Sequence, residues 1–106
     1  MTAIPILRLS LPPAGQSLLG WCLYEDDRWA GPCPQESDEQ GFLVYADEAS
    51  AYAALAREMK RRCAWFEEGT LHGGDLRCLW YPMRVTWFAD GHLYDEASSE
   101  HFPPAR

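Results

Sequence analysis

The stretch that decides the fold runs from Asp47 to Gly69 and reads DEASAYAALAREMKRRCAWFEEG. Asp47 is a good helix N-cap, and Glu48 places negative charge in the first turn, where the helix dipole favours it. Apolar side chains follow at spacings of three and four, namely Tyr52, Leu55, Ala56, Met59, Cys63 and Phe66. This period predicts a helix over about residues 48–67, with the apolar stripe packed on a sheet and Gly69 as its terminator.

Short apolar runs bounded by turn residues predict strands on both sides of this helix. They cover residues 4–9, 18–24 and 41–45 before it, and residues 76–81, 83–88 and 92–94 after it. The Asp90-Gly91 pair is a hairpin signal, so we expect a two-residue turn and antiparallel pairing there. Strands, one long helix and strands again predict an α+β fold: an antiparallel or mixed sheet of about five to six strands with the helix on one face.

The chain has 106 residues, which predicts a single domain over 1–106. Within it, residues 30–40 read AGPCPQESDEQ, a run of turn formers and charge without periodicity. We therefore expect an acidic surface loop at about 30–40. The polar chain end predicts a flexible C-terminal tail from about residue 96.

Sixteen acidic residues against nine basic ones give a net charge of −7. Such a surface repels phosphate backbones and anionic lipids, so we expect no direct nucleic-acid contact and no membrane partner. The first twenty residues lack a basic start, and Arg8 and the Pro12-Pro13 pair interrupt their apolar run. This pattern is unlike a signal peptide and predicts a cytoplasmic protein, in which cysteines stay reduced.

The cysteines and histidines offer the main chemical alternatives. The four cysteines form no close pair of the kind found in structural zinc sites, although Cys63, His72 and Cys78 would make a mixed site if the helix end met the next strand. Cys78 with His72 or His92 is the corresponding arrangement for a small enzyme or ligand-binding domain. No nucleophile elbow or phosphate-binding glycine loop accompanies them, and no cofactor is expected.

Two tryptophans point instead to an interaction surface. By helical spacing Trp65 lies with Ala54 and Glu58 on the side expected to face water, and exposed tryptophan is typical of binding hot spots. Trp29 stands between the acidic segments 25–27 and 36–39. An aromatic side chain with a rim of carboxylates suits a basic partner surface.

These features favour a small acidic protein-binding module, including an inhibitor of the immunity or anti-defence type, that acts on a basic protein surface. The predicted contact residues are Asp26, Asp27, Trp29, Glu36, Asp38, Glu39 and Trp65. The same surfaces would also suit a homodimer. A small enzyme or ligand-binding domain and a zinc-binding domain are the competing functions, because a fold of this class predicts no activity by itself.

Overall fold

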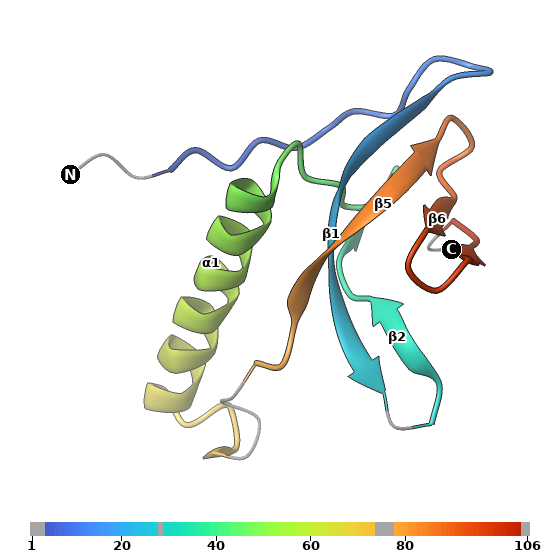
Figure 1. The fold of residues 1–106 in the computed structure, drawn as a ribbon. Helices are drawn as coiled ribbons and strands as arrows, with labels where there is room; N and C mark the ends of the chain where they lie inside the picture. Colours follow the sequence, from blue (N-terminus) through green and yellow to red (C-terminus); the bar gives the residue numbers. More distant parts are fainter. Residues whose placement is uncertain (1–3, 28, 74–77, 105–106) are drawn as a thin grey trace.

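The computed structural model, which describes residues 4–27, 29–73 and 78–104, is built around a five-stranded antiparallel sheet with strand order β2-β1-β5-β6-β7 (Figure 1). The elements are β1 (Ser17–Asp27), β2 (Gly31–Pro34), β3 (Ser37–Asp38), β4 (Gly41–Phe42), α1 (Glu48–Glu67), β5 (Tyr81–Phe88), β6 (Leu93–Asp95) and β7 (Glu100–Phe102). Strands β3 and β4 form a separate two-stranded hairpin. The predicted α+β fold is confirmed.

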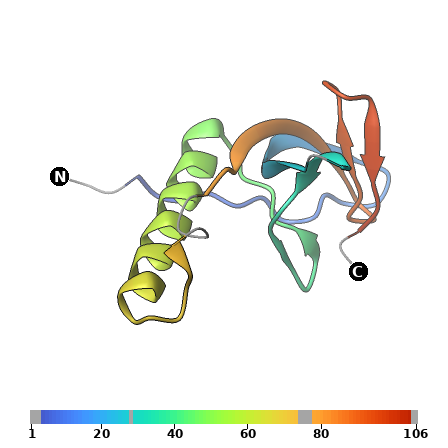
Figure 2. The same ribbon diagram turned by 90° about the horizontal axis from the view of Figure 1, so that it is seen from below.

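The centre of the sheet is the pair of β1 and β5, in register from Ser17 opposite Phe88 to Tyr24 opposite Tyr81. Helix α1 packs against these two strands, and Figure 2 shows β6 and β7 curling away on the other side. Because side chains alternate along a strand, Leu23 joins the cluster under the helix while Cys22 and Tyr24 join the one inside the curl. The sheet therefore carries a core on both faces.

The limits of α1 agree with the prediction, and local contacts explain both ends. The Oδ1 atom of Asp47 accepts a hydrogen bond from the Ser50 amide at 2.7 Å, as an N-cap does. At the other end Gly69 has a φ of 78°, and its amide donates to the Phe66 carbonyl oxygen at 3.0 Å. This left-handed residue ends the helix at the expected glycine.

The predicted packing face of α1 is wrong in most positions, although Leu55 of the apolar stripe does pack against the core under the helix. Tyr52, from the apolar stripe, is 54% exposed, whereas Ala51, Ala54 and Glu58 are buried. The small alanines let the helix approach Leu23 closely, and the charge of Glu58 is offset by two arginines: Arg61 Nη1 lies 3.2 Å and Arg62 Nε 3.1 Å from its carboxylate. Because Glu58 is charged, the spacing of apolar residues does not identify the buried face of the helix.

Several predicted strands also need correction. Residues 4–9 form no strand. Instead they lie along the chain before α1, where the Leu9 amide donates to the Val44 carbonyl oxygen and the Ala46 amide donates to the Leu7 carbonyl oxygen, each at 2.8 Å. The strand expected at 41–45 is only Gly41–Phe42, and Tyr45 instead bridges to Trp21 in β1. Of the strand expected at 76–81, residues 76–77 lie outside the described ranges and only Tyr81 is in β5.

The expected loop at 30–40 and the expected tail both contain strands. Strand β2 pairs with β1 although it holds two prolines. The backbone nitrogens of Pro32 and Pro34 face the outer edge of the sheet, where no donor is needed. The alternate residues face β1, and the Gln35 amide donates to the Leu23 carbonyl oxygen at 2.9 Å. Strand β7 pairs with β6, and its Phe102 ring packs edge-on against Tyr24, with ring centroids 5.7 Å apart. These long-range pairings decide the structure of both segments.

The turn between β5 and β6 confirms the antiparallel hairpin but has three residues rather than two. The Gly91 amide donates to the Phe88 carbonyl oxygen at 2.9 Å, and the Phe88 amide donates to the His92 carbonyl oxygen at 3.1 Å. Gly91 has a φ of 88°, the left-handed conformation that such a turn requires at its last position. No helix in the described ranges combines the length and apolar content that a membrane crossing requires.

Candidate functional site

The turn between β1 and β2 carries the most exposed aromatic side chain among the predicted contact residues. Trp29 is 93% exposed in this turn. Asp26 is exposed at the end of β1, where its Oδ1 atom accepts a hydrogen bond from the Tyr81 hydroxyl at 2.7 Å. The backbone of Asp27 belongs to β1, and its side chain lies outside the described part. Trp29 and the oriented carboxylate of Asp26 thus lie three residues apart in the chain, at the Asp27 end of β1.

The second predicted acidic segment lies elsewhere. Glu36 accepts a hydrogen bond from the buried Tyr45 hydroxyl at 2.5 Å, so this carboxylate is part of the packing. Asp38 accepts from the Gln40 amide at 2.8 Å, and Glu39 is exposed beside it. This β3–β4 turn lies against the β5–β6 turn, since a β-carbon on Gly91 would be 3.4 Å from the Gln40 carbonyl oxygen.

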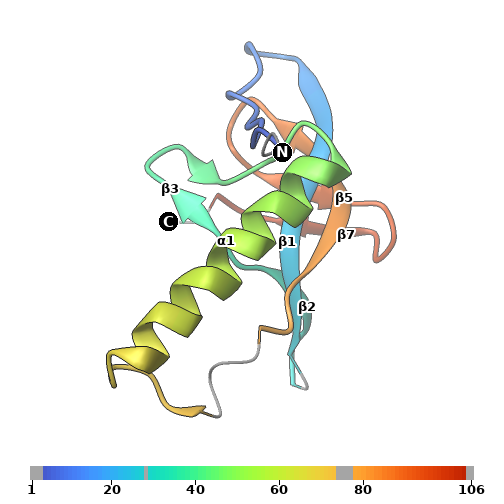
Figure 3. The ribbon, with the colours of Figure 1, turned by 90° about the vertical axis from the view of Figure 1, so that its left-hand side faces the viewer.

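The two acidic segments therefore occupy opposite ends of the sheet. The β5–β6 turn adjoins the Ser17 end of β1, whereas Trp29 follows its Asp27 end. A strand rises about 3.3 Å per residue, so the two ends of β1 are roughly 33 Å apart. Figure 3 likewise shows β3 well away from the β1–β2 turn. The structure does not bring the predicted contact residues into one surface.

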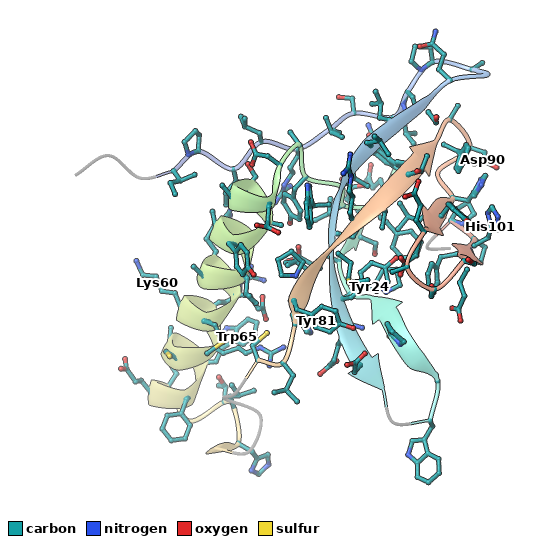
Figure 4. The ribbon with its side chains drawn as sticks, in the orientation of Figure 1. Tyr24, Lys60, Trp65, Tyr81, Asp90 and His101 are labelled. Carbon is teal, nitrogen blue, oxygen red and sulfur yellow. The ribbon has the colours of Figure 1, made fainter. Side chains whose placement is uncertain are left out.

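Trp65 occupies a third environment, which is basic. It is 40% exposed and points from the last turns of α1 toward the sheet side, opposite to Lys60 (Figure 4). The Arg61 guanidinium carbon lies 5.9 Å from the centre of its ring, a cation–π contact. Ala54 and Glu58, on the same side of the helix, are buried, so the expectation that this side faces water holds only for Trp65 near the helix end.

The predicted zinc residues are not assembled. Cys63 and His72 are exposed and Cys78 is half-buried. Within the part of the chain that the structure describes, no three His, Cys, Asp or Glu side chains are grouped so as to hold a metal ion. In contrast, Cys22 is a core residue: its thiol donates to the Leu43 carbonyl oxygen at 3.3 Å, and burial raises its pKa, with Glu36 adding to the shift. A thiol held protonated in this way is a poor nucleophile.

The surface of the described residues includes two shallow depressions. One of about 340 Å³ is lined by Gly15, Gln16, Ser17, Phe88, Ala89, Asp90 and His92. Another of about 440 Å³ is lined by Trp21, Pro82, Met83, Arg84, Glu96 and Ala97.

Three buried polar atoms lack a hydrogen-bond partner among the described residues, namely the Tyr24 hydroxyl, Trp87 Nε1 and Asp95 Oδ2, but none of these residues lines either depression. They offer no polar group to a ligand in these depressions.

Sequence reasoning missed a cluster of rings on the β5–β6–β7 side. His92 and His101 lie with 5.6 Å between their ring centroids, although His101 falls in the expected tail. Alternation along the strand after the Asp90-Gly91 turn could have placed His92 and Tyr94 on one face of the sheet. The addition of His101 to this face depends on the pairing of β7 with β6.

No protein-family model, no curated protein and no solved structure matches this chain.

Proposed function

We propose that this protein is a small protein-binding module whose β1–β2 turn engages a basic partner surface. The observation that carries the proposal is the 93% exposure of Trp29 next to the acidic end of β1. A large indole on the surface is typical of a binding hot spot, because a partner that covers it removes much apolar area from water. The neighbouring carboxylates favour arginine and lysine at the rim of such a contact.

The charge of the whole chain supports a basic partner. The net charge of −7 attracts a positive surface over a distance and speeds its encounter. Close to the turn, the Tyr81 hydroxyl holds the Asp26 carboxylate in one orientation, so part of the contact is preorganised. A nucleic-acid-binding enzyme has a basic face of this kind, and a module that covered the face would act as an inhibitor of the immunity or anti-defence type.

The proposal is tested by affinity capture from a lysate of the source cells with tagged native protein and two variants. Trp29→Ala removes the proposed anchor, and Tyr52→Ala removes an exposed aromatic side chain from the outer face of α1. We expect a basic protein that the native form and Tyr52→Ala retain and that Trp29→Ala loses. Loss of a hot-spot tryptophan costs roughly 2 kcal/mol or more, about a thirtyfold loss of affinity. Capture that survives Trp29→Ala, or the absence of any captured protein, contradicts the proposal.

A further inference from the structure

Four ring-bearing residues share one face of the β5–β6–β7 part of the sheet: Phe88, His92, Tyr94 and His101. Tyr94 is directly opposite His101 in the register of β6 and β7. His92 lies two residues before Tyr94 and therefore points to the same side, diagonally adjacent to His101. The intervening Leu93 points into the core. Strand geometry thus brings together two of the three histidines of the chain.

The rings of this face are in contact. Phe88 stacks on His92 with 4.2 Å between centroids and 9° between planes. Tyr94 lies 4.6 Å and His92 lies 5.6 Å from His101, again between ring centroids. The His92 side chain is 26% exposed, so Phe88 restricts its ring while part of it still reaches solvent.

Asp90 selects the proton position on His92. Its Oδ1 atom lies 2.5 Å from His92 Nδ1 and also accepts a hydrogen bond from the His92 amide at 3.1 Å. A carboxylate oxygen at Nδ1 is an acceptor, so this contact favours the tautomer that carries its proton on Nδ1 and leaves Nε2 as the acceptor nitrogen. Metal-binding histidines are oriented in the same way by a carboxylate behind the ring.

We propose that His92 and His101 bind one divalent transition-metal ion between their imidazole rings, with Asp90 as a positioning residue. Metal–nitrogen bonds are about 2.1 Å long, which puts the ring centres of two imidazoles on one tetrahedral ion about 5 to 5.5 Å apart. The observed 5.6 Å is close to that spacing. Imidazole ligands suit Ni²⁺, Cu²⁺ and Zn²⁺ rather than Mg²⁺ or Ca²⁺.

Water completes the coordination, because no third protein ligand is grouped with the two rings in the described ranges. The site is independent of the proposed partner surface. It follows the β5–β6 turn, at the end of the sheet away from Trp29.

The test is a titration of the native chain with Ni²⁺, followed by nuclear magnetic resonance of the histidine ring protons. Ni²⁺ is paramagnetic and broadens signals close to it. We expect the signals of His92 and His101 to broaden together and saturate at one ion per chain, while those of exposed His72 stay sharp. Since Ni²⁺ also binds thiolates, this readout separates the proposed site from the exposed thiol of Cys63.

Three variants complete the design. His101→Ala should weaken Ni²⁺ binding at His92 by at least tenfold, because it removes one of two ligands, and His72→Ala should leave binding unchanged. Asp90→Asn should weaken binding by roughly tenfold while both rings remain the ligands. The unperturbed signals of each variant without metal confirm that it is folded. Equal affinity in His101→Ala, or broadening of His72 before His92 and His101, overturns the proposal, and so does the absence of any broadening at millimolar Ni²⁺.

Discussion

Gly20 and Tyr45 lie closer together than a side chain at residue 20 would allow. A β-carbon on Gly20 would be 2.9 Å from the Tyr45 carbonyl oxygen and 2.4 Å from Cγ1 of Val44. The approach arises because Tyr45 and Trp21, the neighbour of Gly20, exchange two backbone hydrogen bonds of 2.9 and 2.7 Å. Glycine at this position lets the chain before α1 lie against the middle of β1.

Gly20→Ala should therefore destabilise the protein. The backbone oxygen of Tyr45 cannot move aside without loss of the bridge to β1, so we expect the free energy of unfolding to fall by about 1–3 kcal/mol. Gly73→Ala is the control, since the nearest atom to its β-carbon would be 3.6 Å away on Phe66. Urea denaturation of both variants measures the difference, and equal losses would contradict the close approach at Gly20.

The docking face of α1 makes a second prediction. Ala54 is buried on the side of α1 that faces the sheet, and Tyr52 is exposed on the opposite side of the helix. Ala54→Leu should lower the free energy of unfolding by about 1–3 kcal/mol through overpacking. Tyr52→Ala should change it by less than about 0.5 kcal/mol. Denaturation curves of the two variants decide the matter: a larger loss for Tyr52→Ala would mean that the apolar stripe packs on the sheet after all.

Tyr81 predicts a loss of stability in alkaline solution. Burial, and then the hydrogen bond to Asp26, raise its pKa from 10.0 to about 12. The folded state therefore favours the protonated hydroxyl, and this contribution is complete below pH 10.0 and is lost as the pH rises through about 12. Tyr81→Phe has no hydroxyl to ionise.

The Tyr81→Phe variant should consequently lose less stability than the native protein over this pH range. The measurement is the free energy of unfolding in urea at several alkaline pH values, with Tyr52→Phe as the control for a tyrosine on the exposed helix face. Parallel losses in the native protein and in Tyr81→Phe would show that Tyr81 does not account for the alkaline destabilisation.

The separation of the acidic segments makes a fourth prediction about binding. Asp26→Lys and Asp38→Lys change the charge equally, and each removes one hydrogen bond accepted by the carboxylate. With the captured partner, Asp26→Lys should slow association roughly tenfold and reduce its dependence on salt, because it reverses a charge beside the proposed contact. Asp38→Lys, at the other end of the sheet, should have a much smaller effect. Stopped-flow kinetics at several salt concentrations measure both, and a larger effect of Asp38→Lys would move the contact to the β3–β4 turn.

Part of the candidate site could be predicted from local sequence. Trp29 comes two residues after the acidic run 25–27, so its place just beyond the acidic end of β1 follows from the chain alone. The predicted grouping of Glu36 with Trp29 failed, because Glu36 instead accepts a hydrogen bond from the Tyr45 hydroxyl, 9 residues further along the chain. The pair of His92 and His101 was missed because it depends on the register of β6 and β7.

The sequence by itself determined the features whose physical causes lie within a few residues. Asp47 and Gly69 set the ends of α1 through contacts of one helical turn, and Gly91 supplies the left-handed conformation of the β5–β6 turn. Only the tertiary structure decided which face of α1 is buried, which short segments become β2 and β7, and which acidic and imidazole groups meet. These features depend on partners far away in the chain, such as the strand that pairs with Gln35 or the core that receives Phe102. A local pattern carries no information about such partners, because their interaction energy exists only once the chain has folded.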